Sequence, residues 1–581
     1  MKEVRLFGKN LDEITFFFCI FVQNYWQMMK LRTHYILSLL FLLTAMTAWA
    51  QGDKPYPKYE VRAVWLTTIG GIDWPHSYSN GSQAAVSKQK QELRDILDKL
   101  QKANINTILI QTRVRGTTIY PSDIEPWDGC LSGKPGTSPG YDALQFAIDE
   151  CHKRGMECHA WVVTIPMGKW NKAGCQNMRR THPELIKKIG EDGYMNPEHP
   201  GTAPYLARMC KEIVSRYDVD GVHLDYIRYP ETWKITVPRN EGRRYITTIV
   251  QQIHDAVKSV KPWVKMSCSP VGKFNDLSRY SSHGWNAYHA VCQDAQGWLR
   301  DGLMDQLYPM MYFRDNQFFP FAADWKENSY GKTIAPGLGI YFLDPREGKW
   351  LLSDVTRQLH VLRTLGLGHT YFRSKFFTDN VKGVYDYASL QIDPYPALIP
   401  PMTWANSSQP AAPAEFSVNK YSGMTQLSWN RAPYTYYNIY ASKTHPVDVE
   451  DIRNLVAQRV EGSNLSIATD KEYFYAVTAV NRYGVESKPQ QSWSKGEGLS
   501  AHMLTHDNKQ LQLPDAAQLT NARYVTIESL PGNIISTLPI QRTKEKPYTV
   551  DIHKLKDGVY VVKTLEKKGL THRLGMFTIK R

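Results

Sequence analysis

The sequence predicts an α/β protein, a (β/α)8 TIM barrel followed by one or two small all-β sandwich domains. Three observations predict this fold. Strand-like and helix-like segments alternate over 58–394, and such alternation places parallel strands inside a layer of helices. The strand candidates number eight, as in a closed barrel. After a linker rich in Pro, Ala and Ser at 395–411, short strands of alternating polarity replace the helices.

The eight strand candidates share short runs of β-branched and aliphatic residues. They are 61–68, 107–115, 157–166, 221–229, 264–271, 305–313, 333–342 and 369–377. Helical periodicity lies between them; within 88–102, for example, Leu93, Ile96, Leu97 and Leu100 recur at helix spacing. An open doubly wound sheet is the alternative, and it lacks support because no Gly-rich phosphate loop follows the first strand candidate.

Residues 1–50 form a leader that differs from the rest of the chain. Within it, 28–50 has a basic start, an apolar run at 36–43 and a small-x-small site at 48–50, which is a signal-peptide pattern. The apolar run is too short to span a bilayer, so no transmembrane segment is expected. We therefore expect an exported protein, at the cell surface, in the periplasm or outside the cell, whose mature chain begins at Gln51.

Two β regions follow the barrel. Residues 412–492 contain Trp429 in "LSWN" and the run "YFYAVTAVNRYGV", and these motifs resemble a fibronectin type III sandwich. Residues 505–581 end in a Leu-x-x-Gly-x-Tyr turn and a strand closed by Lys580 and Arg581, which resembles the C-terminal sorting domain of the type IX secretion system. That resemblance implies secretion machinery as a partner. The alternative is a small sandwich that only spaces or packs.

Charge and composition limit the classes of partner. A hydrophobic content of 42% with 22% charged residues is typical of globular chains and excludes a disordered protein. The net charge of +14 favours anionic polymers such as wall glycans or acidic polysaccharides. No nucleic acid partner is expected, because the sequence contains no basic run or nucleic-acid-binding motif.

The cysteines and histidines predict neither a disulfide framework nor a metal site. Seven cysteines follow the leader, an odd number without a CxxC pair, so most are expected to be buried thiols. Cys130 and Cys175 lie in expected loops that could meet in a disulfide. The histidines show no metal-ligand spacing, so no metal and no cofactor is expected.

The strand candidate at 221–229 carries the leading candidate for catalysis. Because side chains alternate along a strand, His223 and Asp225 share one face. Such barrels have their active sites at the carboxyl ends of the strands, which is where Asp225 is expected. The alternative interpretation is an Asp225 that caps the next turn and pairs with Arg228.

A charge partner and a second acid are also expected. An arginine inside a barrel needs a compensating charge, and Asp225 is the expected partner of Arg113. That ion pair would lower the pKa of Asp225, which suits a nucleophile or charge stabiliser. A glycosidase would then need a second, more apolar carboxylate, and Asp73, Asp128 and Asp344 are the candidates.

Further basic and aromatic side chains at the expected barrel mouth are candidates for substrate binding. They are Arg113, Arg115, Trp74, Trp127, Trp161, His223, Tyr226, Arg228, Tyr229, Tyr312 and Tyr341. Aromatic faces stack on sugar rings, although core packing is the competing interpretation for each tryptophan.

Seven motifs resemble a known family. They are "EVRAVWLTTIGGIDWP", "TILIQTRVRGTTIYPSDIEPWDG", "GMECHAWVVTIP", "DGVHLDYIRYP", "KMSCSPVGKF", "DQLYPMMYF" and "APGLGIYF". Together they resemble the glycosyl-hydrolase-like family with a family-10-type barrel, over about residues 58–392. The resemblance implies a glycoside hydrolase of the bacterial envelope, with Asp225 as the leading catalytic carboxylate and Arg113, Trp161, Tyr226 and Tyr229 around it. Pro309-Met310 departs from the family, in which many members have a proline-glutamine pair.

The sequence therefore predicts a glycoside hydrolase that acts by carboxylate catalysis on an envelope or environmental polysaccharide. Some members of the family resemble enzymes that cut peptidoglycan strands lacking stem peptides, which makes such strands one candidate substrate. The alternative is a non-catalytic surface glycan-binding protein, which needs no second carboxylate. A deacetylase or esterase would need a metal triad or a nucleophile elbow, and the sequence shows neither.

Overall fold

A computed structural model describes most of the chain after the leader. The described residues are 56–280, 284–421, 423–469, 471–492, 504–513, 522–529, 534–540, 548–566 and 573–580. The expected leader and signal peptide, and Arg581, lie outside them. Among the described helices, none is both long enough and apolar enough to cross a bilayer.

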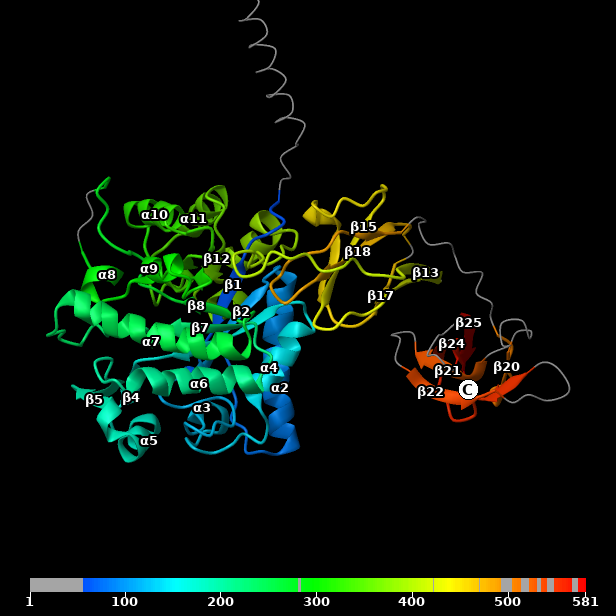
Figure 1. The fold of residues 1–581 in the computed structure, drawn as a ribbon, viewed down its shortest axis with the longest axis horizontal. Coiled ribbons are helices and arrows are strands. Elements are labelled where there is room, and N and C mark those ends of the chain that lie inside the picture. The colour runs from blue at the N-terminus through cyan, green and yellow to red at the C-terminus, as the bar shows by residue number, and fades with distance from the viewer. Residues whose placement is uncertain are drawn as a thin grey trace, which may run out of the picture. The chain divides into compact units, whose positions relative to one another are not determined.

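The first large part of the chain is a closed barrel of parallel strands (Figure 1). The strands pair in the order β10-β9-β8-β7-β3-β2-β1-β12-β11. Their bounds are β1 Arg62–Leu66, β2 Thr107–Arg113, β3 Glu157–Val163, β7 Gly221–Asp225, β8 Lys265–Cys268, β9 Gln306–Leu307, β10 Thr333–Ile334, β11 Gly337–Leu338 and β12 His369–Tyr371. β10 and β11 are halves of one strand, so the two ends of this order join and the eight predicted strands close.

Each predicted strand segment contains one of these strands, and the predicted (β/α)8 fold is confirmed. Every segment was predicted longer than the strand it contains, and two of them run into a helical turn or helix. The segment 333–342 runs past β11 into a 3₁₀ turn at Ile340–Leu343, and 369–377 runs past β12 into α12, Ser374–Thr378. In both places apolar residues continue beyond the strand because they pack under the loops, and periodicity does not distinguish this from a buried strand.

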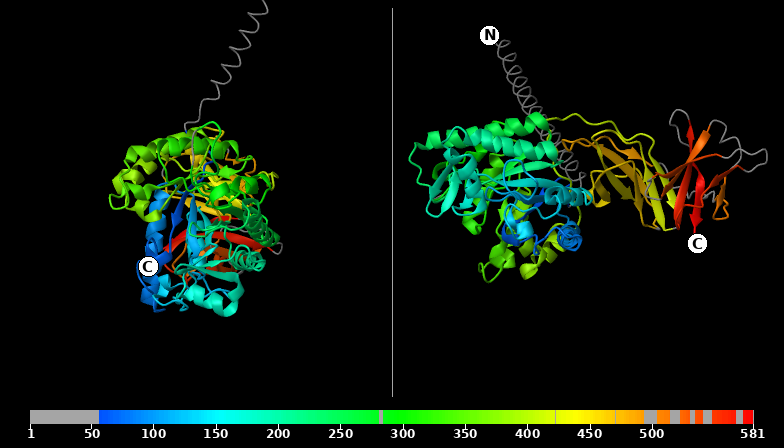
Figure 2. Two further views of the ribbon diagram at one scale, coloured as in Figure 1. Left: turned by 90° about the vertical axis from the view of Figure 1, so that its left-hand side faces the viewer. Right: turned by 90° about the horizontal axis from the view of Figure 1, so that it is seen from below.

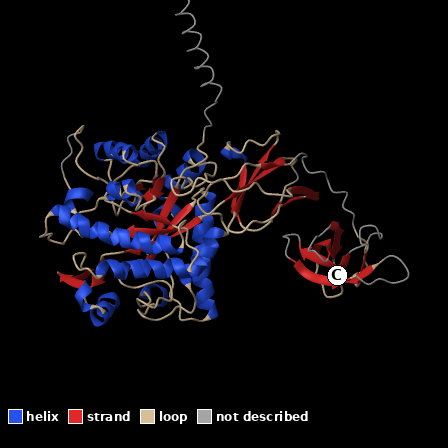
Figure 3. Cartoon of the chain, in the orientation of Figure 1, coloured by secondary structure: helices blue, strands red, loops and turns tan. Residues whose placement is uncertain are grey.

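Helices cover the outside of the barrel strands (Figure 3). The connecting helices are α2 Gln83–Lys102, α4 Ala143–His152, α6 Thr202–Arg216, α7 Arg239–Val260, α9 Ala295–Arg300, α10 Phe319–Glu327, α11 Leu352–Thr364 and α12, with short helices α3 Gly129–Ser132, α8 Ala287–Ala290 and α13 Val384–Tyr387. α2 begins where the Ser82 side chain caps it, and Leu93, Leu97 and Leu100 are buried as the predicted periodicity requires.

An insertion between β3 and α6 was not predicted. It consists of the antiparallel sheet β4-β6-β5 and helix α5, Ala173–Thr181. The strands are β4 Pro166–Lys169, β5 Ile186–Ile189 and β6 Asp192–Met195. The segment follows the carboxyl end of β3, so it stands beside the mouth of the barrel.

Two small β domains follow the barrel, as predicted (Figures 1 and 2, yellow to red). The first has one sheet of β13 Ser417–Tyr421, β14 Met424–Ser428 and β17 Asn464–Ile467, and another of β15 Tyr436–Ser442, β16 Leu455–Val460, β18 Phe474–Val480 and β19 Gln490–Gln491. Leu427 and Trp429 pack against Ile439 and Val477 between the sheets, so this domain is a sandwich. Its kinship to fibronectin type III remains a prediction.

The second β domain has its own core around Val525, Ile527 and Phe577. Its sheets are β20 Gln510–Gln512 with β23 Thr549–Asp551, and β22 Ile534–Pro539, β21 Ala522–Ser529, β24 Gly558–Glu566 and β25 Arg573–Ile579. Its role in sorting remains a prediction.

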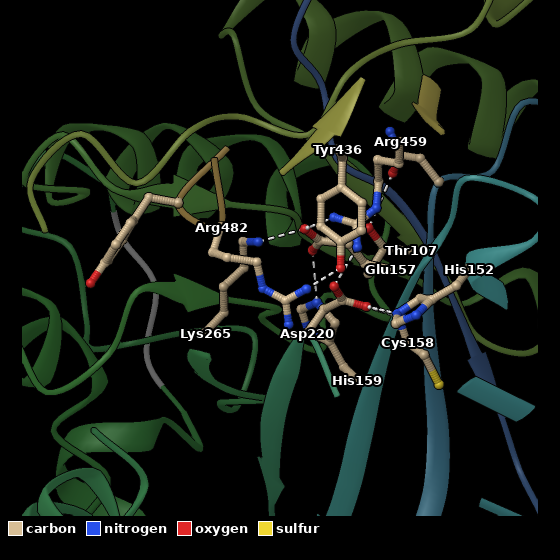
Figure 4. A network of polar contacts seen from close by, with 12 residues as sticks. Thr107, His152, Glu157, Cys158, His159, Asp220, Lys265, Tyr436, Arg459 and Arg482 are labelled. Carbon is tan, nitrogen blue, oxygen red and sulfur yellow. Dashed lines mark hydrogen bonds and ion pairs between the residues drawn. The ribbon is translucent and has the colours of Figure 1, made fainter. Parts of the chain in front are cut away.

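The first sandwich is joined to the amino-terminal ends of the barrel strands by ion pairs (Figure 4). Arg459 contacts Glu157 at the start of β3, with Nη1 3.1 Å from the carboxylate, and also pairs with Asp220, which precedes β7. Arg482 pairs with Asp218. We call Glu157, Asp220 and Arg459 the floor cluster, because they lie at the end of the barrel opposite the mouth.

The seven cysteines of the described chain are buried free thiols. The disulfide considered between Cys130 and Cys175 does not form; the Cys175 thiol instead points at the Met167 carbonyl, 3.3 Å away.

Candidate active site

A cavity of about 600 Å³ opens at the carboxyl ends of the barrel strands. Residues at or just beyond the ends of several strands line it, including Gln111 of β2, Trp161 of β3, Asp225 of β7 and Phe372 after β12. In a (β/α) barrel this face carries the chemistry, because the loops that follow the strands converge there. The cavity is therefore the candidate active site.

Asp225 is the buried carboxylate of this cavity. It ends β7, is 7% exposed, and accepts hydrogen bonds at Oδ1 from the Ser269 hydroxyl at 2.8 Å and the Tyr226 amide at 2.8 Å. Its Oδ2 accepts from the Trp161 indole at 3.1 Å. Burial raises the pKa of Asp225 above its ordinary value, and these hydrogen bonds and the charge of Arg228 only partly oppose the increase.

The expected ion pair between Arg113 and Asp225 is wrong. The Arg113 guanidinium is fully buried and forms a bidentate pair with Glu125, at 2.8 Å and 2.7 Å, and it also donates to the Thr164 carbonyl at 2.8 Å. Tyr205 donates to the same carboxylate at 3.0 Å. Because Glu125 already compensates Arg113, no cation forms an ion pair with Asp225 among the described residues, and the pKa of Asp225 rises where we expected it to fall.

The expected second carboxylates are not among the residues that line the cavity. Asp73 accepts from the Thr67 amide at 2.9 Å and pairs with Arg373. Asp128 caps α3, accepting from the Cys130 amide at 2.7 Å. Asp344 binds the side chain of the nearby Arg346. Each of these carboxylates is therefore engaged in a loop or a cap, and none lines the cavity.

The aromatic candidates divide into two groups. Trp161, Tyr226 and Tyr312 line the cavity beside Phe372, whose ring centroid lies 5.2 Å from that of Tyr312. Tyr226 has φ +52, so the chain turns sharply after Asp225 and the ring of Tyr226 can face the cavity. Tyr341 supports Tyr312 from outside the lining, with a centroid separation of 5.7 Å.

The other aromatic candidates are packed elsewhere. Trp74 is buried and donates to the Gln89 carbonyl at 2.9 Å, and Trp127 packs against the core. Tyr229 is buried and donates to Glu198 at 3.2 Å. These three side chains do not line the cavity. Trp74 and Tyr229 are core residues for an ordinary reason, since a large ring fills volume while its polar atom finds one partner.

His223 lies deeper in the barrel than the cavity. Its ring accepts from the Trp65 indole at 3.2 Å and contacts the Ser267 hydroxyl at 3.0 Å. Burial holds the pKa of His223 well below its ordinary value, so the ring is neutral. His223 therefore belongs to the barrel interior rather than to the cavity wall.

Of the basic candidates, Arg115 lines the cavity, and Arg228 lies behind the lining, against Tyr226 and Glu231. Arg115 is exposed and forms no ion pair with any residue in the described ranges. Arg228 is only 2% exposed; its guanidinium lies 4.5 Å from the Tyr226 ring and donates to Glu231 at 2.6 Å.

Sequence reasoning missed several residues of the lining, and Asp192, Glu231 and Met310 are the ones that bear on the chemistry. Glu231 comes directly after Pro230 in the loop that follows β7, a position that barrel topology already marks as part of the mouth. Asp192 belongs to the unpredicted insertion and carried no such signal. Met310 occupies the position at which many members of the resembled family have glutamine, so an apolar side chain stands there in the lining.

No cluster of three or more His, Cys, Asp or Glu side chains able to hold a metal ion occurs in the described ranges. The side chains at the cavity that can act on a sugar are carboxylates, two arginines, neutral polar groups such as Gln111, and aromatic rings. This set can transfer a proton to and from a bound sugar and can stack on its rings.

Comparisons with known proteins agree with this geometry. Residues 60–341 match the family model described as Glycosyl hydrolase-like 10. Glycosyl hydrolase YngK of Bacillus subtilis (strain 168) is 27% identical over 511 residues, covering 79% of this chain and 97% of that protein. Glycosyl hydrolase DigH of Escherichia coli (strain K12) is 31% identical over 287 residues, covering 44% of this chain and 65% of DigH. These matches support a glycosidase-type function for the barrel.

Proposed function

We propose that the barrel belongs to this glycosyl-hydrolase-like family and cleaves glycosidic bonds of an envelope or environmental polysaccharide, with Asp225 as proton donor. One observation carries the proposal. A carboxylate at the end of a barrel strand is buried in an aromatic-walled cavity, and burial raises its pKa. A raised pKa favours the protonated carboxyl group, and a glycosidic oxygen needs a proton from its general acid.

The groups around Asp225 suit that role. A sugar ring that stacks on Trp161 or Tyr312 would lie beside the carboxyl group, since both rings line the same cavity. After Asp225 has donated its proton, the new carboxylate keeps three donors, from Ser269, Tyr226 and Trp161. These bonds strengthen as charge develops and lower the barrier to proton transfer.

Substrate and location are finer parts of the same proposal. We propose a bacterial envelope glycan as the substrate class, with peptide-free peptidoglycan strands as its first test member. We also propose that the protein is exported, on the signal-peptide pattern at 28–50, with the last β domain engaging secretion machinery. N-terminal sequencing of protein from its native host should begin at or near Gln51, and an uncleaved chain in the cytosol would contradict export.

The test of function is a panel of defined polysaccharides that includes peptide-free wall glycan. The purified full chain should release new reducing ends from at least one member, and Asp225→Asn should release almost none. Binding of a glycan without release by the unmodified chain would instead support the non-catalytic receptor.

A further inference from the structure

A glycosidase needs a second catalytic group besides its proton donor, and the cavity offers few. Three carboxylates line it: Asp225, Asp192 and Glu231. Asp192 belongs to the insertion sheet and pairs with Lys169 of the neighbouring strand, Nζ to Oδ2 3.3 Å. Glu231 belongs to the loop that begins at the end of β7, the strand that carries Asp225. The same strand therefore positions both Glu231 and the proton donor Asp225.

Arg228 holds Glu231 in place. The buried guanidinium donates to Glu231 Oε1 at 2.6 Å and to the Tyr229 carbonyl at 3.1 Å. It lies 4.5 Å from the ring centroid of Tyr226 and 5.4 Å from that of Trp285. A planar guanidinium fixed by two rings and a carbonyl is a rigid anchor, and it leaves the carboxylate one preferred orientation.

The environments of the two carboxylates differ. Asp225 is buried and meets only neutral hydrogen-bond donors, whereas the Glu231 side chain is 49% exposed and pairs with a cation. Within the described ranges, Glu231 makes no hydrogen bond other than that from Arg228, so one of its oxygens is free to accept from water. Two carboxylates held in opposite environments can divide the acid and base roles.

We propose that Glu231 is the general base of the reaction and that hydrolysis inverts the configuration at the anomeric carbon. This inference rests on the proposed function and adds to it the second catalytic residue and the stereochemical course. Glu231 lies at the solvent-open rim and Asp225 in the buried wall. A water molecule can therefore stand between Glu231 and the sugar, which is the arrangement of inverting enzymes.

The step balances as follows. The Asp225 hydroxyl gives its proton to the glycosidic oxygen, and the bond from that oxygen to the anomeric carbon breaks. The water oxygen bonds to the anomeric carbon from the opposite face, and Glu231 takes one proton from that water. The products are a sugar with a free, inverted anomeric hydroxyl and a leaving alcohol. Solvent then returns the proton from Glu231 to Asp225.

The first measurement uses NMR to determine the anomeric configuration of the freshly released sugar. The unmodified full chain acts on the most active glycan of the panel. We expect the inverted anomer to appear first and to mutarotate afterwards. Initial formation of the retained anomer would overturn the inference and leave the proposed glycosidase function intact. A chain that cleaves no glycan would overturn both.

Variants test Glu231 itself. Glu231→Gln should lower kcat about 10³-fold with little change in KM, and the acidic limb of its pH–rate profile should disappear, because that limb records ionisation of the base. Glu241→Gln is the matched control: Glu241 also pairs with an arginine three residues away, Arg244, but lies outside the cavity lining. Its activity should equal that of the unmodified chain.

A glycosyl fluoride separates the two carboxylates, since fluoride leaves without help from an acid. On this substrate Asp225→Asn should recover most of its rate, whereas Glu231→Gln should not. Full activity of Glu231→Gln, or a large kcat loss in Asp192→Asn with none in Glu231→Gln, would overturn the assignment. Glu231→Asp, which keeps the charge, guards against misfolding, because partial activity with the acidic limb retained supports the base role.

Discussion

The two ends of the barrel treat buried carboxylates in opposite ways. At the floor, burial alone would raise the pKa of Glu157, but the charge of Lys265 and a hydrogen bond with His159 outweigh it and bring the pKa to about 2. Asp220 follows the same pattern, with Arg459 and His152 as its partners (Figure 4). At the mouth, Asp225 has no such cation and its pKa is raised. The difference is therefore a cation paired with the carboxylate, since burial is common to both ends and the charge of Arg228 only partly opposes the rise at Asp225.

This comparison explains why Glu157 and Asp220 stabilise the fold, whereas Asp225 can transfer a proton. A buried carboxylate with a matched cation stays ionised through the accessible pH range and exchanges no proton. A buried carboxylate without a paired cation has a raised pKa, which favours its protonated form and suits a proton donor. Perturbed carboxylates of the second kind concentrate at functional sites.

The largest expected effect comes from removing the proton donor at the mouth. Asp225→Asn should lower turnover roughly 10³-fold or more, about 4 kcal/mol of barrier, because the glycosidic oxygen loses its proton donor. The melting temperature measured on the same preparation should stay close to that of the unmodified chain. Retained turnover with a lowered melting temperature would assign Asp225 a structural role and favour the glycan-binding alternative.

At the floor, removing the cation should affect stability rather than activity. Arg459→Ala leaves Glu157 and Asp220 short of one partner in a buried position, and we expect a loss of about 3 kcal/mol in the free energy of unfolding. Denaturant unfolding measures this loss, and the specific activity of the folded protein should be unchanged. Arg453→Ala removes a surface pair with Asp451 in the same sandwich and should cost no more than about 1 kcal/mol.

Arg113 tests whether a paired arginine near the mouth of the barrel stabilises the fold without changing the pKa of Asp225. Because Arg113 pairs with Glu125 and not with Asp225, Arg113→Ala should destabilise the barrel by about 3 kcal/mol. The alkaline limb of the pH–rate profile, which Asp225 sets as the acid, should stay where it is. A clear displacement of that limb in the folded variant would show that Arg113 acts on Asp225 after all.

The fall in stability at acidic pH should also arise from the floor cluster, through Glu157. The pKa of folded Glu157 is about 2 against an ordinary value of 4.5, so its contribution is fully present above pH 4.5. That contribution is lost as the pH falls from 4.5 through 2, because the unfolded chain binds the proton first. Melting temperatures between pH 6 and pH 3 should therefore fall less steeply in Arg459→Ala than in the unmodified chain. Equal slopes would contradict this account.

The smallest expected effect is a shift of one limb of the pH–rate profile. Trp161→Phe keeps an aromatic ring in the cavity but removes the indole donor to Asp225, one of the bonds that favour its ionised form. The pKa of Asp225 should rise further, and the alkaline limb should move to higher pH with only a modest loss of kcat. A shift to lower pH would contradict the assigned hydrogen bond.

Much of the barrel could be predicted from sequence because its signals are local. A run such as 221–229 shows its strand by composition and its two faces by alternation, and Ser82 with the leucines after it defines α2. The location of Asp225 was predictable in the same way, because a residue at the carboxyl end of a barrel strand lies at the mouth for any conformation of the loops. Trp161, on the neighbouring strand β3, reached the cavity for that reason too.

Charge pairing was decided by the tertiary structure alone. Glu125, the partner of Arg113, lies in a loop whose path no periodicity predicts, and the same holds for the cap formed by Asp128 and the contacts of Asp73. Arg459 reaches Glu157 across 302 residues of chain. The sequence by itself determined which elements form and which residues stand at their ends, because those depend on neighbours along the chain. Only the tertiary structure decided which charges meet, because the energy of a buried ion depends on the groups that packing brings to within a few ångströms of it.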